Sequence, residues 1–131
     1  MKRQNISSGA PWEAIVGYSR AVRVGNTVHV AGTTAVDQEG KTLYPGNPYQ
    51  QTRVILQKIE QALQEAGMTM ADVVRTRLYV TNMDHWQEIG RAHGEYFANV
   101  RPAATMVEIS RLISPDLLVE IEADAVLSHE N

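Results

Sequence analysis

The segment Leu118-Val119-Glu120-Ile121-Glu122-Ala123-Asp124-Ala125-Val126-Leu127 alternates between apolar and other side chains. This period of two is typical of a β-strand with one face in a hydrophobic core. The core face carries only small and branched apolar residues, namely Val119, Ile121, Ala123, Ala125 and Leu127. The other face carries three carboxylates and two apolar residues, namely Leu118, Glu120, Glu122, Asp124 and Val126. The segment predicts a half-buried strand over 118–127.

Two earlier segments extend this sheet. Residues 103–111 predict the preceding strand, and a turn through residues 114–116 separates it from the last one. One face of that strand is predicted to carry Ala104, Met106, Glu108 and Ser110. Residues 73–80 predict a middle strand, with Val74, Thr76, Leu78 and Val80 on one face and Val73, Arg75, Arg77 and Tyr79 on the other. We expect Glu108, the three carboxylates of the last strand, Arg75 and Arg77 to gather on one sheet face.

The N-terminal half predicts a hairpin, a loop and a helix. Residues 18–24 and 27–31 are β-like and are joined by Gly25-Asn26, a pair typical of a tight hairpin turn. Residues 37–48 are rich in turn formers and predict a loop. Asn47 and Gln50 predict a capping box around Pro48, and Gly67 predicts the helix end. An apolar stripe runs between them through Leu56, Ile59, Leu63 and Ala66.

A second helix is predicted after the middle strand. Asp84 and Gln87 suggest its capping box, and its apolar stripe is Trp86, Ile89, His93 and Phe97. The element order is hairpin, helix, strand, helix, strand, strand. Strand–helix–strand passages favour right-handed crossovers between parallel strands, and both helices have one apolar side. We therefore expect a single domain over 1–131 with both helices on the same sheet face.

Composition narrows the classes of function. The chain has 131 residues, a formal net charge of −3 and no cysteine, which disfavours nucleic-acid binding and excludes disulfides and cysteine metal sites. His29, His85, His93 and His129 are not spaced as ligands of one metal ion. We expect no metal and no cofactor. The N-terminus predicts no signal peptide, so we expect a cytoplasmic protein.

The charged sheet face has two interpretations. Cross-strand ion pairs on a solvated face would explain it and would contribute little stability. Alternatively, the face lies between subunits and contains a polar site, an interpretation favoured by the apolar residues among the charges, namely Tyr79, Met106, Leu118 and Val126. The pattern alone leaves both open.

Several ordered segments between residues 15 and 127 resemble motifs of the YjgF/Rid family. They are residues 101–109 (RPAATMVEI) with 118–123 (LVEIEA), residues 16–21 (VGYSRA), residues 30–32 (VAG) and residues 72–80 (DVVRTRLYV). The resemblance implies an α+β, chorismate-mutase-like fold, in which a six-stranded mixed sheet is covered on one face by two helices. It also implies a homotrimer with ligand clefts between subunits. Family members hydrolyse reactive enamines and imines to a keto acid and ammonia without a cofactor.

The resemblance implies roles for individual residues. Glu120 corresponds to the glutamate that positions water, or else it pairs with a cross-strand arginine. Tyr18 lines the cleft or packs beside the hairpin, and Gly32 lets the backbone approach a ligand or only ends a strand. The expected ligand-binding positions are Tyr18, Gly32, Thr33, Arg101, Ala104, Thr105 and Met106.

The sequence also departs from the deaminating members of the family. Ala104 stands where they carry the arginine that holds the substrate carboxylate. Gly90 stands where they often have asparagine, and Ala31 stands where they often have serine. The cations that could replace the arginine are Arg101, Arg20, Arg75 and Arg77. We expect a Rid-like hydrolase acting on a different imine or enamine, or a non-catalytic trimer that binds a metabolite. A ribonuclease is the third alternative, disfavoured by the acidic composition.

Overall fold

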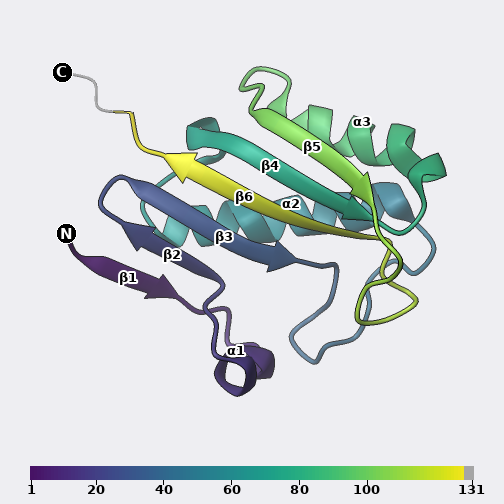
Figure 1. Cartoon of the computed structure of the whole chain (residues 1–131), viewed down its shortest axis with the longest axis horizontal. Helices are drawn as coiled ribbons and strands as arrows, with labels where there is room; N and C mark the ends of the chain where they lie inside the picture. The colour runs from purple at the N-terminus through teal and green to yellow at the C-terminus, as the bar shows by residue number, and fades with distance from the viewer. Residues whose placement is uncertain (129–131) are drawn as a thin grey trace.

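A computed structural model of the chain describes residues 1–128, so His129 lies outside the described part. The six strands form one mixed sheet in the order β1-β2-β3-β6-β4-β5 (Figure 1). They are β1 (Arg3–Ile6), β2 (Ala21–Val24), β3 (Thr27–Thr33), β4 (Val73–Val80), β5 (Ala103–Glu108) and β6 (Val119–Val126). β4 and β5 are parallel, and the other neighbouring strands are antiparallel.

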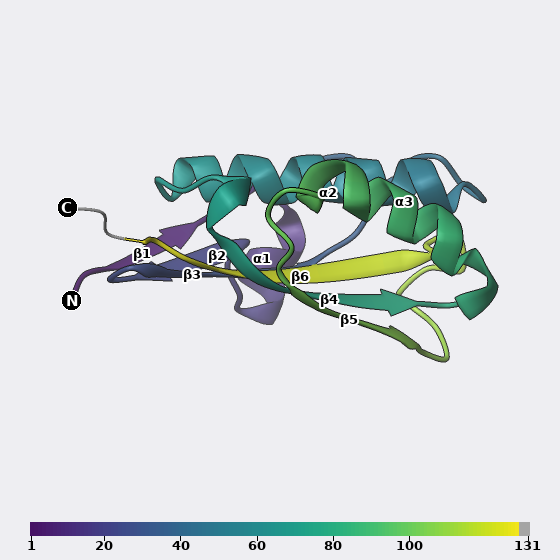
Figure 2. The ribbon, with the colours of Figure 1, turned by 90° about the horizontal axis from the view of Figure 1, so that it is seen from above.

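Two long helices cover one face of the sheet. α2 (Pro48–Glu65) and α3 (Trp86–Phe97) lie together on this face, and the opposite face is left open (Figure 2). A short helix, α1 (Pro11–Val16), links β1 to β2, and 3₁₀ turns at Met70–Asp72 and Met83–His85 precede β4 and α3. The predicted six-stranded sheet covered on one face by two helices is confirmed.

The core lies between the sheet and the two helices. The inner residues of β6, Val119, Ile121, Ala123 and Ala125, are at most 1% exposed. They pack with buried residues of α2 that include Ile55, Leu56, Ile59 and Leu63. The face assignment that the sequence predicted for the last strand is therefore confirmed.

Asn47 and Gly67 determine where α2 begins and ends. The Asn47 side chain accepts a hydrogen bond from the Gln50 N–H at 3.0 Å, as its N-cap role predicts. The reciprocal half of the capping box was wrong, because the Asn47 N–H donates to the Tyr44 carbonyl instead. Gly67 has a φ of +85°, and the Met68 N–H donates to the Leu63 carbonyl, which closes a Schellman motif.

The predicted capping box of the second helix was also wrong. A 3₁₀ turn begins earlier, at Met83, and the Asn82 side chain caps it by accepting from the Asp84 N–H. The stripe was partly correct, because Ile89 and Phe97 are buried whereas Trp86 is 54% exposed.

Two face predictions were wrong because of strand register. A bulge between Val73 and Arg75 turns Val73 into the core and leaves Val74 exposed. β5 pairs with β4 so that Ala104 lies opposite Thr76 and Met106 opposite Leu78. The residues Ala104, Met106 and Glu108 therefore lie on the helix-covered face, and Thr105 shares the open face with Arg77. The Glu108 carboxylate accepts a hydrogen bond from the Met83 N–H on that covered side.

Two negative observations apply to residues 1–128. No helix there is long and apolar enough to cross a membrane. That part of the chain also holds no cluster of three or more acidic or histidine side chains that could share a metal ion. His93 instead contacts the Thr76 hydroxyl at 2.9 Å and lies against the Phe97 ring.

Candidate functional site

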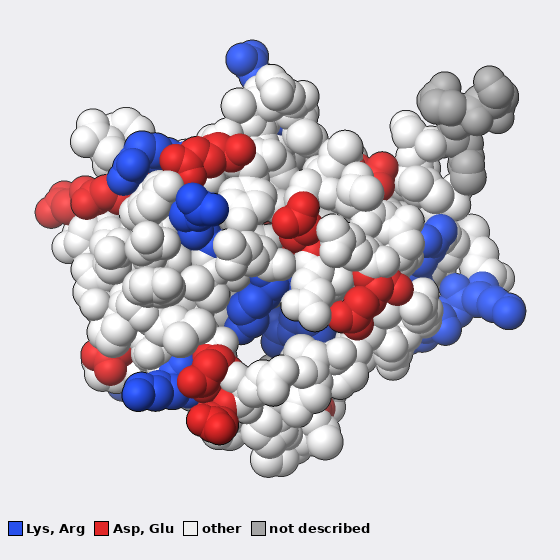
Figure 3. All heavy atoms as spheres, turned by 180° about the vertical axis from the view of Figure 1, so that it is seen from behind, with Lys and Arg blue, Asp and Glu red and all other residues white. Residues whose placement is uncertain are grey.

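A cavity of about 960 Å³ opens where β3 ends. Its walls come from five parts of the chain: the segment from Ile6 to α1, the residues just before β2, the end of β3 with the loop after it, α2, and the segment 112–120. Figure 3 views the molecule from behind and shows a hollow with basic side chains inside it. The cavity therefore joins segments that are far apart in the sequence.

The Glu120 carboxylate lies against the backbone of Gly32 in this cavity. A Cβ atom at Gly32 would come within 2.5 Å of Glu120 Oε2, so no side chain fits there while the carboxylate keeps its position. Partial burial raises the pKa of Glu120, the Glu122 carboxylate raises it further, and Arg20 opposes the shift. Glu120 is thus a carboxyl group whose pKa moves toward neutrality beside an open space.

Arg20 provides a buried positive charge in the same cavity. Its side chain is buried, and Nη1 donates to the Gly32 carbonyl and to the Thr33 hydroxyl, each at 2.8 Å. Nη2 lies 3.4 Å from the Tyr18 hydroxyl. Within residues 1–128 no carboxylate forms an ion pair with Arg20 within 4.0 Å. Since buried cations are normally paired, Arg20 is suited to hold an anion.

Lys58 adds a second cation from α2. Its Nζ donates to the carbonyls of Thr34 at 2.7 Å and Val36 at 3.2 Å. Burial lowers the pKa of Lys58 to about 8, and repulsion from Arg20 contributes while Asp37 opposes the shift. Lys58 therefore fixes the start of the loop after β3 and stays mostly charged at neutral pH.

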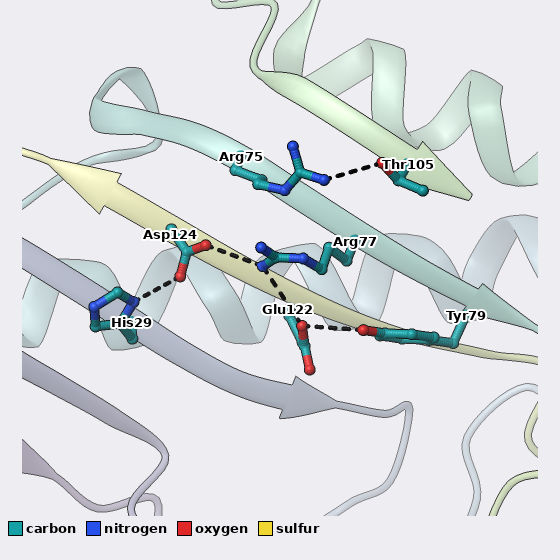
Figure 4. A network of polar contacts seen from close by, with 7 residues as sticks. All are labelled: His29, Arg75, Arg77, Tyr79, Thr105, Glu122 and Asp124. Atoms are coloured by element: carbon teal, nitrogen blue, oxygen red, sulfur yellow. Dashed lines mark hydrogen bonds and ion pairs between the residues drawn. The ribbon is translucent and has the colours of Figure 1, made fainter. Parts of the chain in front are cut away.

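The open sheet face carries a separate polar network (Figure 4). Arg77 contacts Asp124 at 3.1 Å and Glu122 at 3.7 Å. The Tyr79 hydroxyl donates to Glu122, and His29 Nδ1 lies 2.7 Å from Asp124 Oδ1. Of the charged face that the sequence predicts, this network contains Arg75, Arg77, Glu122 and Asp124 but neither Glu108 nor Glu120.

The structure brings together only part of the predicted site. Tyr18, Gly32 and Glu120 line the cavity, and the Thr33 hydroxyl bonds to Arg20 behind them. Ala104, Thr105 and Met106 lie on β5, which β4 and β6 separate from β3 in the sheet. Arg101, which precedes β5, donates to the Ala98 carbonyl. None of these four residues, nor Gly90 on α3 or Ala31 on β3, lines this cavity in one chain.

Among the four arginines that could replace the missing one, only Arg20 reaches the cavity. Arg77 is engaged in the open-face network, and Arg75 donates to the Thr105 hydroxyl at 3.2 Å. In the described chain Glu120 therefore lines the cavity and makes no cross-strand ion pair with an arginine.

Sequence reasoning missed Lys58 and the helix α1 beside the cavity opening. Lys58 follows Ile55 by three residues and precedes Ala62 by four, so it lies beside the buried stripe of α2. A lysine in that position indicates a polar site beside the core, because a charged group next to a buried stripe needs a polar partner or access to solvent. Trp12 lines the cavity from α1, a helix that the sequence pattern did not predict.

Comparison with known proteins agrees with the motifs. The model of the family described as Endoribonuclease L-PSP matches residues 8–127. The uncharacterized protein SCO2049 of Streptomyces coelicolor is 39% identical over 123 residues, which cover 93% of this chain and 90% of that protein. A RutC family protein of Pyrococcus abyssi is 36% identical and covers 82% of this chain and 84% of its own length.

Solved structures show the same similarity. Rv2704 of Mycobacterium tuberculosis, described as a member of the YjgF/YER057c/UK114 family, is 50% identical with a TM-score of 0.88 over 96% of this chain and all of that chain. The YjgF gene product of E. coli is 28% identical with a TM-score of 0.81 over 94% and 98% of the two chains. The chain belongs to the endoribonuclease L-PSP family, which is the YjgF/Rid family that its sequence motifs resemble.

Proposed function

We propose that this protein is a Rid-like hydrolase that converts a carboxylate-bearing imine or enamine to a 2-oxo acid and ammonia. The observation that carries the proposal is that Glu120 and Arg20 line the same cavity. Glu120 is a carboxyl group with a raised pKa, and Arg20 is a buried cation without an acidic partner in the described chain. Together they supply a proton-transfer group and an anion-binding group.

Arg20 holds the substrate carboxylate in place of the family arginine, whose position Ala104 occupies. The guanidinium is held by the Gly32 carbonyl and the Thr33 hydroxyl, so its orientation is fixed before a ligand arrives. Lys58 adds positive charge to the same cavity. A ligand carboxylate near Arg20 would place the adjacent imine carbon toward Glu120, because both side chains border the space beside Gly32.

The reaction then follows from proton transfer. With the imine nitrogen protonated, Glu120 accepts a proton from a water molecule as the water oxygen attacks the imine carbon, which forms a neutral carbinolamine. Glu120 then returns that proton to the amino nitrogen, and ammonia leaves as the C–N bond breaks, while Glu120 takes up the hydroxyl proton as the C=O bond forms. A pKa raised toward neutrality suits both steps, since Glu120 must accept and then donate a proton.

The proposal includes a homotrimer built through the open sheet face. Partly exposed apolar side chains, Val24, Val107 and Val126, surround the charged network on this face. Most oligomers are closed and symmetric, and burial of this face would remove those side chains from water. In such a trimer, β5 of a neighbouring subunit would bring Arg101, Ala104, Thr105 and Met106 toward the cavity, as the resemblance implies.

The test is the rate of ammonia release from freshly generated 2-imino acids. We expect the wild type to accelerate hydrolysis and Glu120→Gln to reduce kcat by about 10²-fold or more, the usual contribution of a general acid–base group. The folded fraction of both proteins is checked by thermal unfolding. Equal rates for a folded Glu120→Gln variant and the wild type would refute the role of Glu120.

A non-catalytic binding trimer is the second candidate, favoured by the alanine at position 104. It predicts that 2-oxo acids bind to the cavity while no imine is hydrolysed faster than in buffer. Substitution of Arg20 would then weaken the binding of 2-oxo acids. Substitution of Glu120 would have no effect on imine hydrolysis, because the wild type would not catalyse it.

A further inference from the structure

Large apolar side chains surround the opening of the cavity. Trp12 and Val16 on α1 are 50% and 69% exposed, and Ile113 in the loop between β5 and β6 is 82% exposed. All three line the cavity that contains Arg20. Exposed apolar side chains that gather in one place indicate a binding surface rather than chance exposure.

The apolar residues of α1 are held firmly in position. The Glu13 carboxylate accepts hydrogen bonds from the Ser7 hydroxyl at 2.9 Å and from the N–H and hydroxyl of Ser8. Gly17 ends the helix with a φ of +91°, and its N–H donates to the Glu13 carbonyl. α1 is therefore fixed at both ends, and Trp12 and Val16 form a prepared surface.

The cavity thus has two chemical zones. Arg20 and Lys58 are basic, and within the described chain neither pairs with a carboxylate within 4.0 Å. Trp12, Val16 and Ile113 are apolar and lie nearer to solvent, as their exposure indicates. A ligand that satisfies both zones has an anionic end and an apolar end.

We propose that the cavity selects 2-imino or 2-oxo acids with a bulky apolar side chain, which packs against Trp12, Val16 and Ile113 while the carboxylate binds Arg20. This inference rests on the proposed function for its substrate class. It adds the identity of the side chain, since a molecule as small as pyruvate would fill little of a cavity of about 960 Å³. The apolar side chain would lose its contact with water, which favours larger ligands.

The experiment is calorimetric titration with pyruvate, 2-oxobutanoate and 4-methyl-2-oxopentanoate. Each additional carbon that becomes buried should raise affinity about fourfold, so the branched acid, which has three more carbons, should bind on the order of 60-fold more tightly than pyruvate. Trp12→Ala should reduce that ratio about fivefold or more while pyruvate affinity is kept. Trp86→Ala is the matched control, because Trp86 is also about half exposed but does not line the cavity.

Three results would overturn the inference. One is equal affinity for the three acids, and another is a size preference that Trp12→Ala leaves unchanged. The third is dissociation of the assembly by Trp12→Ala on a sizing column, which would make this surface a subunit contact. The titration uses stable 2-oxo acids and needs no turnover, so a size preference without imine hydrolysis would contradict only the proposed function. Hydrolysis without a size preference would contradict only this inference.

Discussion

Gly32→Ala tests whether the glycine is required by the carboxylate beside it. A Cβ atom at this position would lie 2.5 Å from Glu120 Oε2, 2.9 Å from Cδ and 3.3 Å from Cγ. The carboxylate would have to retreat by about 0.9 Å to reach the 3.4 Å at which ordinary van der Waals contact begins. A displacement of about 1 Å in a catalytic group can cost on the order of 10²-fold in rate.

The stability effect of Gly32→Ala should be smaller. Overpacking costs about 1–3 kcal/mol, and the end of a glutamate side chain can rotate away, so we expect about 1 kcal/mol. For a domain of this size that loss lowers Tm by about 3 °C. Gly94→Ala is the control, because a Cβ there would meet no atom within 4 Å and the helix α3 would gain a better helix former.

The assay is a double-mutant cycle with Glu120→Ala, measured by thermal unfolding and by imine hydrolysis. In the Glu120→Ala background the destabilisation by Gly32→Ala should disappear, because the clashing atoms are gone. If Gly32→Ala is equally destabilising in the Glu120→Ala background, the backbone of β3 and not the Glu120 carboxylate requires the glycine, and the reasoning is refuted.

Three further predictions concern charge. The folded state raises the pKa of Glu120, so it disfavours the ionised form; Glu120→Gln should therefore be more stable than the wild type at pH 7, and the difference should vanish as pH falls below about 4 in thermal unfolding scans. Affinity for 2-oxo acids should fall as pH rises through about 8, where Lys58 loses its charge, and a Lys58→Met variant should bind more weakly at pH 7 without that pH dependence in titrations. Arg77→Met should lower the stability of the assembly by more than about 1 kcal/mol, the upper end for a solvated ion pair, because it would leave Glu122 and Asp124 without their arginine at the proposed subunit interface. A smaller loss in concentration-dependent unfolding would favour a solvated face.

Local signals predict much of the fold. Gly25-Asn26 predicts the hairpin, Asn47 and Gly67 mark the ends of α2, and the alternation of residues 118–127 places each side chain of β6 on the correct face. Each signal is contained in a few neighbouring residues, which is why it can be read without a structure.

Features that depend on how the strands pair were not predicted from the sequence. β1 carries Arg3, Gln4 and Asn5, all exposed, so only Ile6 gives an apolar signal. β5 is an edge strand, and its register against β4 decides that Ala104 faces the helix side. Alternation within one strand defines two faces but does not say which of them a neighbouring strand shares.

Some residues of the candidate site could be predicted from the sequence, and others could be found only in the structure. The resemblance to family motifs identifies Tyr18, Gly32 and Glu120, which border one cavity in the structure. Arg20 could be considered only as one of four arginines, because the hydrogen bonds to Gly32 and Thr33 that hold it in the cavity form between strands. Lys58 reaches the site from a helix that lies far away in the sequence.

The central claim is that Arg20 and Glu120 act on the same small carboxylate ligand, and a crystal structure with a bound 2-oxo acid tests it most directly. We predict that the ligand carboxylate accepts hydrogen bonds from the Arg20 guanidinium and that the Glu120 carboxylate lies beside the carbonyl carbon. A carboxylate held instead by Arg101 of a neighbouring subunit, or bound on the open sheet face, would contradict the account.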